Sequence, residues 1–299
     1  MAGFVDGPVS VSVPATSANL GPGFDCLGLA LELRDTLVGQ VTSGGLAVGV
    51  RGEGADEVPR DESHLVVTAM RAAFDAMGVQ PAGLELSCRN VVPHGRGLGS
   101  SAAAIVGGIT LARALVADDV RRLDEMGTLT LANSLEGHPD NVAAALLGGL
   151  VVSGQRGGEA WAVSAPIDPS VGTIAFVPSQ GVSTEGTRAL LPVSVPHADA
   201  TANSGLAALL VTALGGATDQ LLRATDDTLH QPYREPAMPE SLRLVRTLRA
   251  AGLPAFLSGA GPSVLTFTLA GVGAQALAHC PDGWAALELA VAADGSRVD

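Results

Sequence analysis

The chain has 299 residues, a formal net charge of −13, and a composition that is 47% hydrophobic but only 3% aromatic. Such a chain is globular and long enough for two lobes, and an acidic charge without a basic run argues against nucleic acid as a partner. The 17 basic residues are all arginines, which excludes a lysine-dependent phosphate loop.

The first half of the chain predicts strands that alternate with helices. Alternating or β-branched runs indicate the strands, and apolar residues at helical spacing indicate the helices. Ser63 is the expected N-cap of the first helix. The predicted elements are strands over 9–13, 29–41, 46–50, 84–88 and 150–152, and helices over 61–77, 102–117, 123–135 and 142–147.

The second half predicts three further strands, over 172–177, 255–258 and 264–268, and three further helices, over 206–214, 219–225 and 240–251. Between the halves, the composition changes at 154–158 and a proline turn follows at 166–169. Turn-forming residues of this kind often mark a domain boundary. We therefore predict an N-terminal domain over 1–160 and a C-terminal domain over 161–299.

The chain shows no sign of a membrane or secretory protein. It has no run of about 18 apolar residues, so we expect no membrane span. Residues 1–12 lack the basic start and apolar stretch that are typical of a secretory signal. The scattered Cys26, Cys88 and Cys280 are too few for a disulfide framework and indicate a reducing compartment. We therefore expect a cytoplasmic protein.

The segment with the clearest chemistry is a glycine loop that feeds the helix predicted over 102–117. It reads Pro93-His94-Gly95-Arg96-Gly97-Leu98-Gly99-Ser100-Ser101-Ala102-Ala103. Such a loop offers free backbone N–H groups and the positive end of the helix dipole to a phosphate group. Without lysine, a phosphate held here depends on backbone amides, serine hydroxyls and a metal ion. The alternative role for Ser101 is a plain helix N-cap.

Three other segments carry polar groups that each have an ordinary structural explanation. Residues 13–30 form a turn-rich stretch that holds Asn19 and Asp25. Residues 136–141 place polar groups between two helices, where an Asp or Asn can cap the second helix. Residues 257–264 form a second glycine turn after a strand. No single one of these segments indicates a function.

Together these segments and the glycine loop resemble the GHMP kinase superfamily, and within it the homoserine kinases, over nearly the whole chain. The stretches over 136–141, 182–192 and 229–234 carry the resemblance to the homoserine kinases. The resemblance implies an α+β, two-lobed fold, with an N-terminal ribosomal-protein-like α/β domain and a C-terminal ferredoxin-like domain. The implied reaction is ATP-dependent phosphorylation of L-homoserine to O-phospho-L-homoserine, a step towards threonine, by an enzyme that is a homodimer.

The resemblance also implies where ATP and Mg²⁺ bind. The loop from Pro93 to Ala103 is matched to the phosphate motif, and Ser101 and Glu136 are the candidate metal ligands. Some members of the family place the metal glutamate further upstream, where this chain has Thr130. Mg²⁺ needs only one or two protein oxygens, so two candidates suffice. His64 stands where many members carry Asn, and it either lies near the base or is an ordinary helix-start histidine.

Homoserine is a zwitterion with one hydroxyl, so its site needs groups of both charges. Asn19 and Asp25 suit the ammonium or the hydroxyl. Arg188 and Arg234 suit the carboxylate, because a guanidinium matches it with two parallel hydrogen bonds. The resemblance adds two further candidate substrate ligands, His138 and Asn141.

The candidate catalytic residues are Asn141, Asp140 and Arg188. Asp140 lies where related kinases offer a catalytic aspartate, but a loose phosphoryl-transfer transition state requires little prior deprotonation. We therefore hypothesise that positioning dominates and that Asp140 is mainly structural. The alternatives are a GHMP kinase for a mevalonate-type or sugar substrate and a non-catalytic ligand-binding relative. A dinucleotide dehydrogenase fits worse, because 95–99 lacks the full G-x-G-x-x-G.

Overall fold

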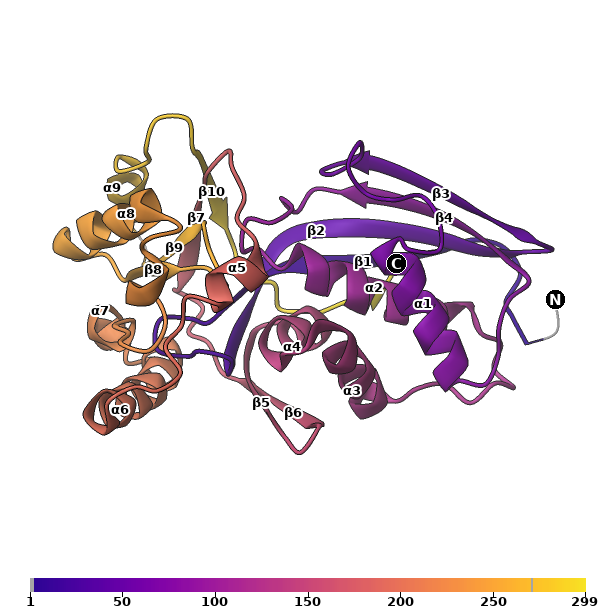
Figure 1. Cartoon of the computed structure of the whole chain (residues 1–299), viewed down its shortest axis with the longest axis horizontal. Helices are drawn as coiled ribbons and strands as arrows, with labels where there is room; N and C mark the ends of the chain where they lie inside the picture. The colour runs from indigo at the N-terminus through magenta and orange to yellow at the C-terminus, as the bar shows by residue number, and fades with distance from the viewer. Residues whose placement is uncertain (1–2, 270) are drawn as a thin grey trace.

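The computed structural model describes residues 3–269 and 271–299, which form two lobes (Figure 1). The N-terminal lobe, coloured indigo to magenta, is built on a seven-stranded sheet. The other lobe, mainly orange to yellow, is built on a four-stranded sheet. The short helix α5 (Thr184–Arg188) lies between the lobes. The two-lobed α+β architecture predicted from the sequence is thereby confirmed.

The first sheet has the strand order β11-β1-β2-β4-β3, and β5 and β6 extend it from β2. β3 and β4 are parallel, and the other pairs are antiparallel. The buried Val11 lies opposite the buried Leu37, so alternate side chains of both strands enter the core. The strands are β1 (Val9–Ala18), β2 (Leu27–Thr42), β3 (Gly45–Gly52), β4 (Gly83–Asn90), β5 (Leu150–Arg156), β6 (Glu159–Ala165) and β11 (Arg297–Val298).

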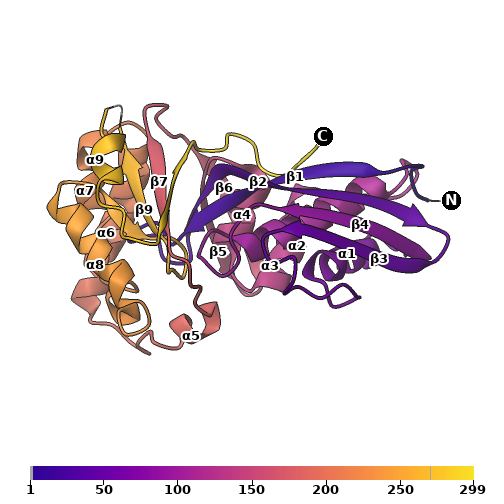
Figure 2. The same ribbon diagram turned by 90° about the horizontal axis from the view of Figure 1, so that it is seen from above.

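Four helices pack on one face of this sheet, as Figure 2 shows. They are α1 (Leu65–Ala76), α2 (Ser100–Leu115), α3 (Glu125–Glu136) and α4 (Pro139–Leu147). α2 is buried between β1 and the other helices, because small apolar residues occupy nearly all of its sides. Gly108 permits a close approach to α1, since a Cβ atom there would lie 2.7 Å from the carbonyl oxygen of Val66.

The second lobe has an antiparallel sheet in the order β10-β7-β9-β8. α8 packs on this sheet through Leu244 and Leu248, which share a buried cluster with Phe176 and Leu257. The strands are β7 (Gly172–Val177), β8 (Ala255–Leu257), β9 (Val264–Thr268) and β10 (Ala285–Leu289). Besides α5, the helices are α6 (His197–Leu214), α7 (Leu221–Ala224), α8 (Pro239–Ala250) and α9 (Gly273–Leu277), with the 3₁₀ turns η1 (Thr218–Gln220) and η2 (Pro232–Arg234).

A buried apolar cluster joins the two lobes. Leu20 and Leu29 of the first lobe pack in it with Phe256 and Phe267 of the second. Leu98, from the glycine loop, is fully buried in the same cluster. Burial of one such side chain contributes about 1.5–3 kcal/mol, so the cluster fixes the glycine loop against the second lobe.

The end of the chain returns to the first lobe. Val298 of β11 lies opposite Val11 of β1, and the Arg34 guanidinium donates to the carbonyl oxygen of Gly295 at 2.5 Å. β6 spans the position of the predicted boundary between residues 160 and 161. The division of the chain at that boundary stays a prediction.

The predicted strands and helices are present. The five strands predicted in the first half extend beyond their predicted bounds, whereas α1, α7 and β8 are shorter than predicted. The prediction that Ser63 caps α1 is wrong. His64 is the N-cap, and the backbone N–H of Ser63 donates instead to the Asp61 carboxylate, 2.9 Å away. α6 begins at His197 rather than at Leu206. β6, β10, β11, α5 and α9 were not predicted, because they are short or carry many exposed residues. No helix in the described part of the chain could cross a membrane.

Candidate active site

The glycine loop turns its carbonyl oxygens into the protein. The carbonyl oxygen of Gly95 accepts from Val182, and that of Leu98 from the N–H of Thr16 at 3.0 Å. The carbonyl oxygen of Gly97 accepts from the Ser258 hydroxyl at 2.6 Å. Within residues 3–269 and 271–299, no acceptor pairs with the loop N–H groups of Gly95, Gly97 or Gly99. The loop therefore presents free donors, which suits an anion.

Positive φ angles produce this arrangement. Gly95, Gly97 and Gly99 have φ angles of 64°, 74° and 71°, values that side chains disfavour. A Cβ atom on Gly97 would also collide with the carbonyl oxygen of Ser258. α2 begins immediately after Gly99, so the positive end of its dipole lies at the same place.

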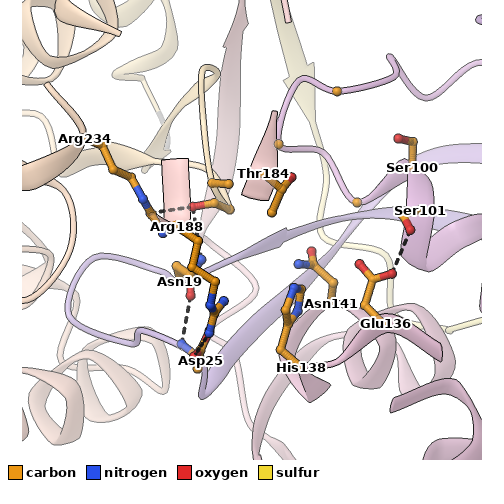
Figure 3. Close-up of a pocket in the computed structure, with 15 residues that line it drawn as sticks. Asn19, Asp25, Ser100, Ser101, Glu136, His138, Asn141, Thr184, Arg188 and Arg234 are labelled. Carbon is orange, nitrogen blue, oxygen red and sulfur yellow. Dashed lines mark hydrogen bonds and ion pairs between the residues drawn. The ribbon is translucent and has the colours of Figure 1, made fainter. Parts of the chain in front are cut away.

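Ser101 and Glu136 lie together beside this loop (Figure 3). Ser101 Oγ donates to Glu136 Oε2 at 2.7 Å. The alternative role of Ser101 as an N-cap is wrong, because Gly99 holds that position. Thr130, the other candidate position for the metal glutamate, is exposed on α3 and lines neither of the two cavities beside the loop. The hydroxyl and carboxylate oxygens are of the type that Mg²⁺ prefers.

A cavity of about 150 Å³ extends from the loop to the segment after β1. One end holds the glycine loop with Ser101 and Glu136, and the other holds charged and amide side chains from both lobes (Figure 3). The cavity is lined by Asn19, Asp25, Gly95, Gly97, Gly99, Ser100, Ser101, Glu136, His138, Asn141, Thr184, Arg188, Arg234, Gly259 and Ala260.

Asn19 and Asp25 share an uncommon backbone conformation at this far end. Both have a φ of 54°, although neither is glycine. Asn19 Oδ1 accepts from the backbone N–H of Asp25 at 2.8 Å, and Asn19 Nδ2 donates to the carbonyl oxygen of Gly259 at 3.1 Å. These bonds connect the loop after β1 to the turn after β8 and hold the Asp25 carboxylate at the cavity.

Two arginines approach the same end from the second lobe. Arg188 of α5 forms an ion pair with Asp25, with Nη1 3.3 Å from Oδ1. Arg234 of η2 is 1% exposed, and burial lowers its pKa to about 10. Their guanidinium carbons lie 5.4 and 5.7 Å from the centre of the Phe24 ring, within cation–π range. The structure therefore brings Asn19, Asp25 and both arginines together.

The segment between α3 and α4 is organised by Asp140. His138 is the N-cap of α4, so the prediction that Asp140 or Asn141 caps this helix is wrong. The Asp140 carboxylate is buried, 3.2 Å from His138 Nδ1, and accepts from the N–H of Asn141 at 2.8 Å. The bond to Asp140 raises the pKa of His138. Asn141 Oδ1 accepts from Thr16 Oγ1 at 2.8 Å. His138 and Asn141 line the cavity, whereas Asp140 does not.

A second cavity, of about 270 Å³, adjoins the first at Ser100 and Ser101. It is mostly apolar. His64 is buried there, which lowers its pKa, and its Nδ1 has no partner among the described residues. The cavity is lined by Asp35, Leu37, Val58, Pro59, Ser63, His64, Leu65, Val66, Asn90, His94, Ser100, Ser101, Ala103 and Ala104.

Two protein-family models match the chain. The GHMP kinases N terminal domain matches residues 64–149, and the GHMP kinases C terminal domain matches residues 208–282. The chain belongs to the GHMP kinase family. The resemblance stated from the sequence is thereby confirmed.

Curated relatives of this GHMP kinase include several homoserine kinases. The one from Streptomyces avermitilis is 52% identical over 97% of this chain and 95% of its own length. The one from Mycolicibacterium smegmatis is 47% identical over 96% of this chain and 95% of its own length. The similarity therefore extends over nearly all of each protein.

Solved structures agree with this assignment. The homoserine kinase from Cytophaga hutchinsonii superposes with a TM-score of 0.86 at 25% identity, over 98% of this chain and 97% of that one. Mevalonate diphosphate decarboxylase from Staphylococcus aureus superposes with a TM-score of 0.69 at 14% identity, over 98% of each chain. Because its identity is only 14%, the similarity to the decarboxylase shows a shared fold alone.

Several predicted loop residues have side chains that do not face the first cavity. The Arg96 guanidinium donates to the carbonyl oxygens of His94, Pro178 and Ser179, so it anchors the loop to the second lobe. Leu98 and Ala102 are fully buried. His94 and Ala103 line the second cavity, and Pro93 lines neither. In Arg96 and Leu98, only the backbone remains available to a ligand.

Some residues of the site in this GHMP kinase were not predicted from the sequence. Thr16, Thr184 and Ala260 lie inside segments that carried the resemblance, but their residue types gave no signal of their own. Asp35 was also not predicted. It is buried beside the second cavity, where burial raises its pKa, and it accepts from the N–H groups of Val91 and Val92.

Proposed function

We propose that this GHMP kinase phosphorylates the side-chain hydroxyl of L-homoserine with ATP, giving O-phospho-L-homoserine and ADP. One observation carries the proposal. A single cavity joins a loop of free N–H donors to a cluster with one carboxylate and two guanidinium groups, Asp25, Arg188 and Arg234. Homoserine kinases that are about half identical over nearly their whole length support the same substrate.

The triphosphate of ATP lies along the glycine loop in this proposal. The unpaired N–H groups of Gly95, Gly97 and Gly99 and the start of α2 replace the lysine that the chain lacks. The second cavity meets the loop at Ser100 and Ser101, and its apolar lining suits the adenosine. His64 then lies beside the base. This arrangement offsets the net charge of −13 at the one place where an anionic substrate must bind.

Mg²⁺ fits the pair formed by Ser101 and Glu136. Their oxygens are already 2.7 Å apart, and Mg²⁺ usually takes one or two protein oxygens and otherwise water and phosphate. In the described part of the chain, no cluster of three or more His, Cys, Asp or Glu residues suits a metal ion. When bound, the metal neutralises charge on the phosphates.

Homoserine lies at the other end of the cavity. Its carboxylate pairs with Arg188 and Arg234, and its ammonium with Asp25 and the amide of Asn19. Asp25 and Arg188 already pair with each other, so a zwitterion that enters between them exchanges one ion pair for two. Neutral or purely anionic alcohols do not satisfy both groups, and this favours an amino acid over mevalonate or a sugar.

The transfer itself depends on positioning. The side-chain oxygen of homoserine forms a bond to the γ-phosphorus, the bond from that phosphorus to the β–γ bridging oxygen breaks, and the hydroxyl proton passes to solvent water. His138 and Asn141 line the cavity between its two ends (Figure 3), where they orient the hydroxyl. Arg188 reaches the same cavity. The buried Asp140 lines neither cavity, which supports an indirect role for it.

An ADP-release assay across homoserine, threonine, serine, mevalonate and galactose tests the proposal. We expect turnover with homoserine and Mg²⁺, and background rates with mevalonate and galactose. Preferred turnover of mevalonate or galactose would instead assign the chain to another branch of the family. No ATP turnover with any alcohol would favour a non-catalytic ligand-binding role.

Three further features stay predictions. The product is expected to enter threonine biosynthesis, the enzyme to be a homodimer, and its location to be cytoplasmic. Sedimentation equilibrium of the purified protein measures whether it is a homodimer. Fractionation of the producing cells measures the location.

A further inference from the structure

Arg234 carries a positive charge that no described carboxylate pairs with directly. Its Nη1 donates to His230 Nδ1 at 2.7 Å and to the carbonyl oxygen of Gly259 at 3.2 Å. Its Nε is buried without a partner among the described residues. A buried charge is costly unless it is paired, so Arg234 is prepared for an anionic group that enters the cavity.

The imidazole of His230 is locked in one tautomer. Its Nε2 lies 2.8 Å from the carbonyl oxygen of Gly21, and a carbonyl can only accept, so Nε2 carries the hydrogen. Nδ1 is then left with a lone pair, which accepts from the Arg234 guanidinium. Full burial lowers the pKa of His230 to about 4, in agreement with a neutral ring.

Contacts on both sides hold this ring in place. The Asp227 carboxylate accepts from the backbone N–H groups of Leu229, His230 and Gln231 and fixes the turn that carries the imidazole. The Phe24 ring stacks on the imidazole, with 5.2 Å between ring centres and 26° between planes. Because Phe24 adjoins Asp25, the histidine connects the arginine of one lobe to the loop of the other.

We propose that His230 is the positioning residue that orients the Arg234 guanidinium toward the carboxylate of the substrate. The inference rests on the proposed function, since it assigns the anionic group to homoserine. His230 itself lines no part of the cavity and acts only through Arg234. Its two ring nitrogens perform different tasks, one to anchor the ring and one to hold the guanidinium.

The test compares His230→Leu with His230→Asn, on homoserine and on 3-aminopropan-1-ol. Leucine has no acceptor, whereas the side-chain oxygen of asparagine lies close to the position of Nδ1. 3-Aminopropan-1-ol is homoserine without its carboxylate. In His230→Leu we expect the KM for homoserine to rise about tenfold or more, because a charge-assisted hydrogen bond is lost. The KM for ATP and the kcat should stay close to wild type.

The carboxylate-free substrate separates positioning from general damage. His230→Leu should leave kcat/KM for 3-aminopropan-1-ol unchanged, and His230→Asn should restore most of the KM for homoserine. Equal losses on both substrates would overturn the inference, as would an unchanged KM for homoserine. If wild type turns over ATP but not homoserine, the proposed function fails instead.

A control and a second pair of variants guard against misfolding. His197→Leu replaces an exposed histidine at the start of α6 and should behave as wild type. If His230→Leu does not fold, His230→Gln, whose amide lies closer to the position of Nε2, is compared with His230→Asn. The inference requires the lower KM in His230→Asn, and equal values would contradict it.

Discussion

The proposed phosphate end of the cavity is built mainly from backbone groups, whereas the proposed amino-acid end is built from side chains. At the phosphate end, carbonyl oxygens turn into the protein and N–H groups remain free, so the residues matter mainly for the conformation that they allow. At the other end, Asp25, Arg188 and Arg234 supply the charges. Substitutions at the loop glycines should therefore act through shape, and those of Asp25, Arg188 and Arg234 through charge.

The largest effect is expected from Gly97→Ala. The Cβ atom would collide with the carbonyl oxygen of Ser258 in a backbone conformation that already disfavours side chains. A shift of about 1 Å in the loop can lower activity about 100-fold, so we expect a loss of that size in kcat/KM for ATP. Calorimetric titration with nucleotide should show the same weakening.

Gly78→Ala is the matched control for that substitution. Gly78 follows α1 with a φ of 76°, and a Cβ atom there meets nothing within 4 Å. It introduces similar backbone strain without a collision at the loop. A drop in ATP affinity of equal size in both variants would show that the loop has no special role.

A smaller effect is expected from Glu136→Gln, which keeps the size of the side chain but removes its charge. Since a carboxylate is the stronger ligand for Mg²⁺, the Mg²⁺ concentration for half-maximal activity should rise by about 10- to 100-fold. Mg²⁺ titrations of the rate measure this shift. Glu125→Gln, at the other end of the same helix, is the control and should leave the titration unchanged.

At the amino-acid end, Arg188→Met should raise the KM for homoserine about tenfold while the KM for ATP stays constant. Asp25→Asn should have a similar effect. Because the two residues pair with each other, the effects should be less than additive in the double variant. Steady-state kinetics of the three variants test this, with Arg243→Met, exposed on α8, as control. Fully additive effects would show that the pair does not act as a unit.

The smallest effect on rate is expected from Asp140→Asn. If Asp140 is mainly structural, kcat should fall by much less than the roughly 100-fold that loss of a general base causes. A loss of several orders of magnitude with KM unchanged would make Asp140 the catalytic base.

The same variant should lower the pKa of His138, because the hydrogen bond to Asp140 is what raises it. A group with a raised pKa stabilises the fold below its unfolded pKa, and this contribution is lost as the pH rises through the folded pKa. The stability difference between wild type and Asp140→Asn should therefore be larger at pH 5 than at pH 8. NMR titration of His138 and urea unfolding at both pH values measure the two effects.

The sequence predicted the backbone end of the cavity better than the side-chain end. The glycine loop is local, so the pattern from Gly95 to Gly99 is enough to predict the free N–H groups that it presents, whereas its phosphate ligand stays a prediction. The pairing of Ser101 with Glu136 came from the resemblance, and the structure places the two oxygens in contact.

Other features depend on contacts between distant segments, which no local pattern reveals. The tautomer of His230 is determined by its hydrogen bond to the carbonyl oxygen of Gly21, more than two hundred residues earlier in the chain. The buried Asp35 carboxylate accepts hydrogen bonds from the backbone N–H groups of Val91 and Val92, which follow β4. The cap predicted at Ser63 and the alternative cap role of Ser101 are both wrong, because α1 and α2 begin after His64 and Gly99, respectively.

The path of the chain limits how the two lobes can move. It leaves the first lobe after β6 and returns before β11, so the second lobe is an insertion held by two separate connections. The buried cluster of Leu20, Leu29, Phe256 and Phe267 adds a third attachment, so more than the two chain connections fixes the relative position of the lobes. The same path brings β11 back to pair with Val11 and Ser12 of β1. A shortened chain that ends after β6 would leave these backbone groups at an unpaired sheet edge and should aggregate.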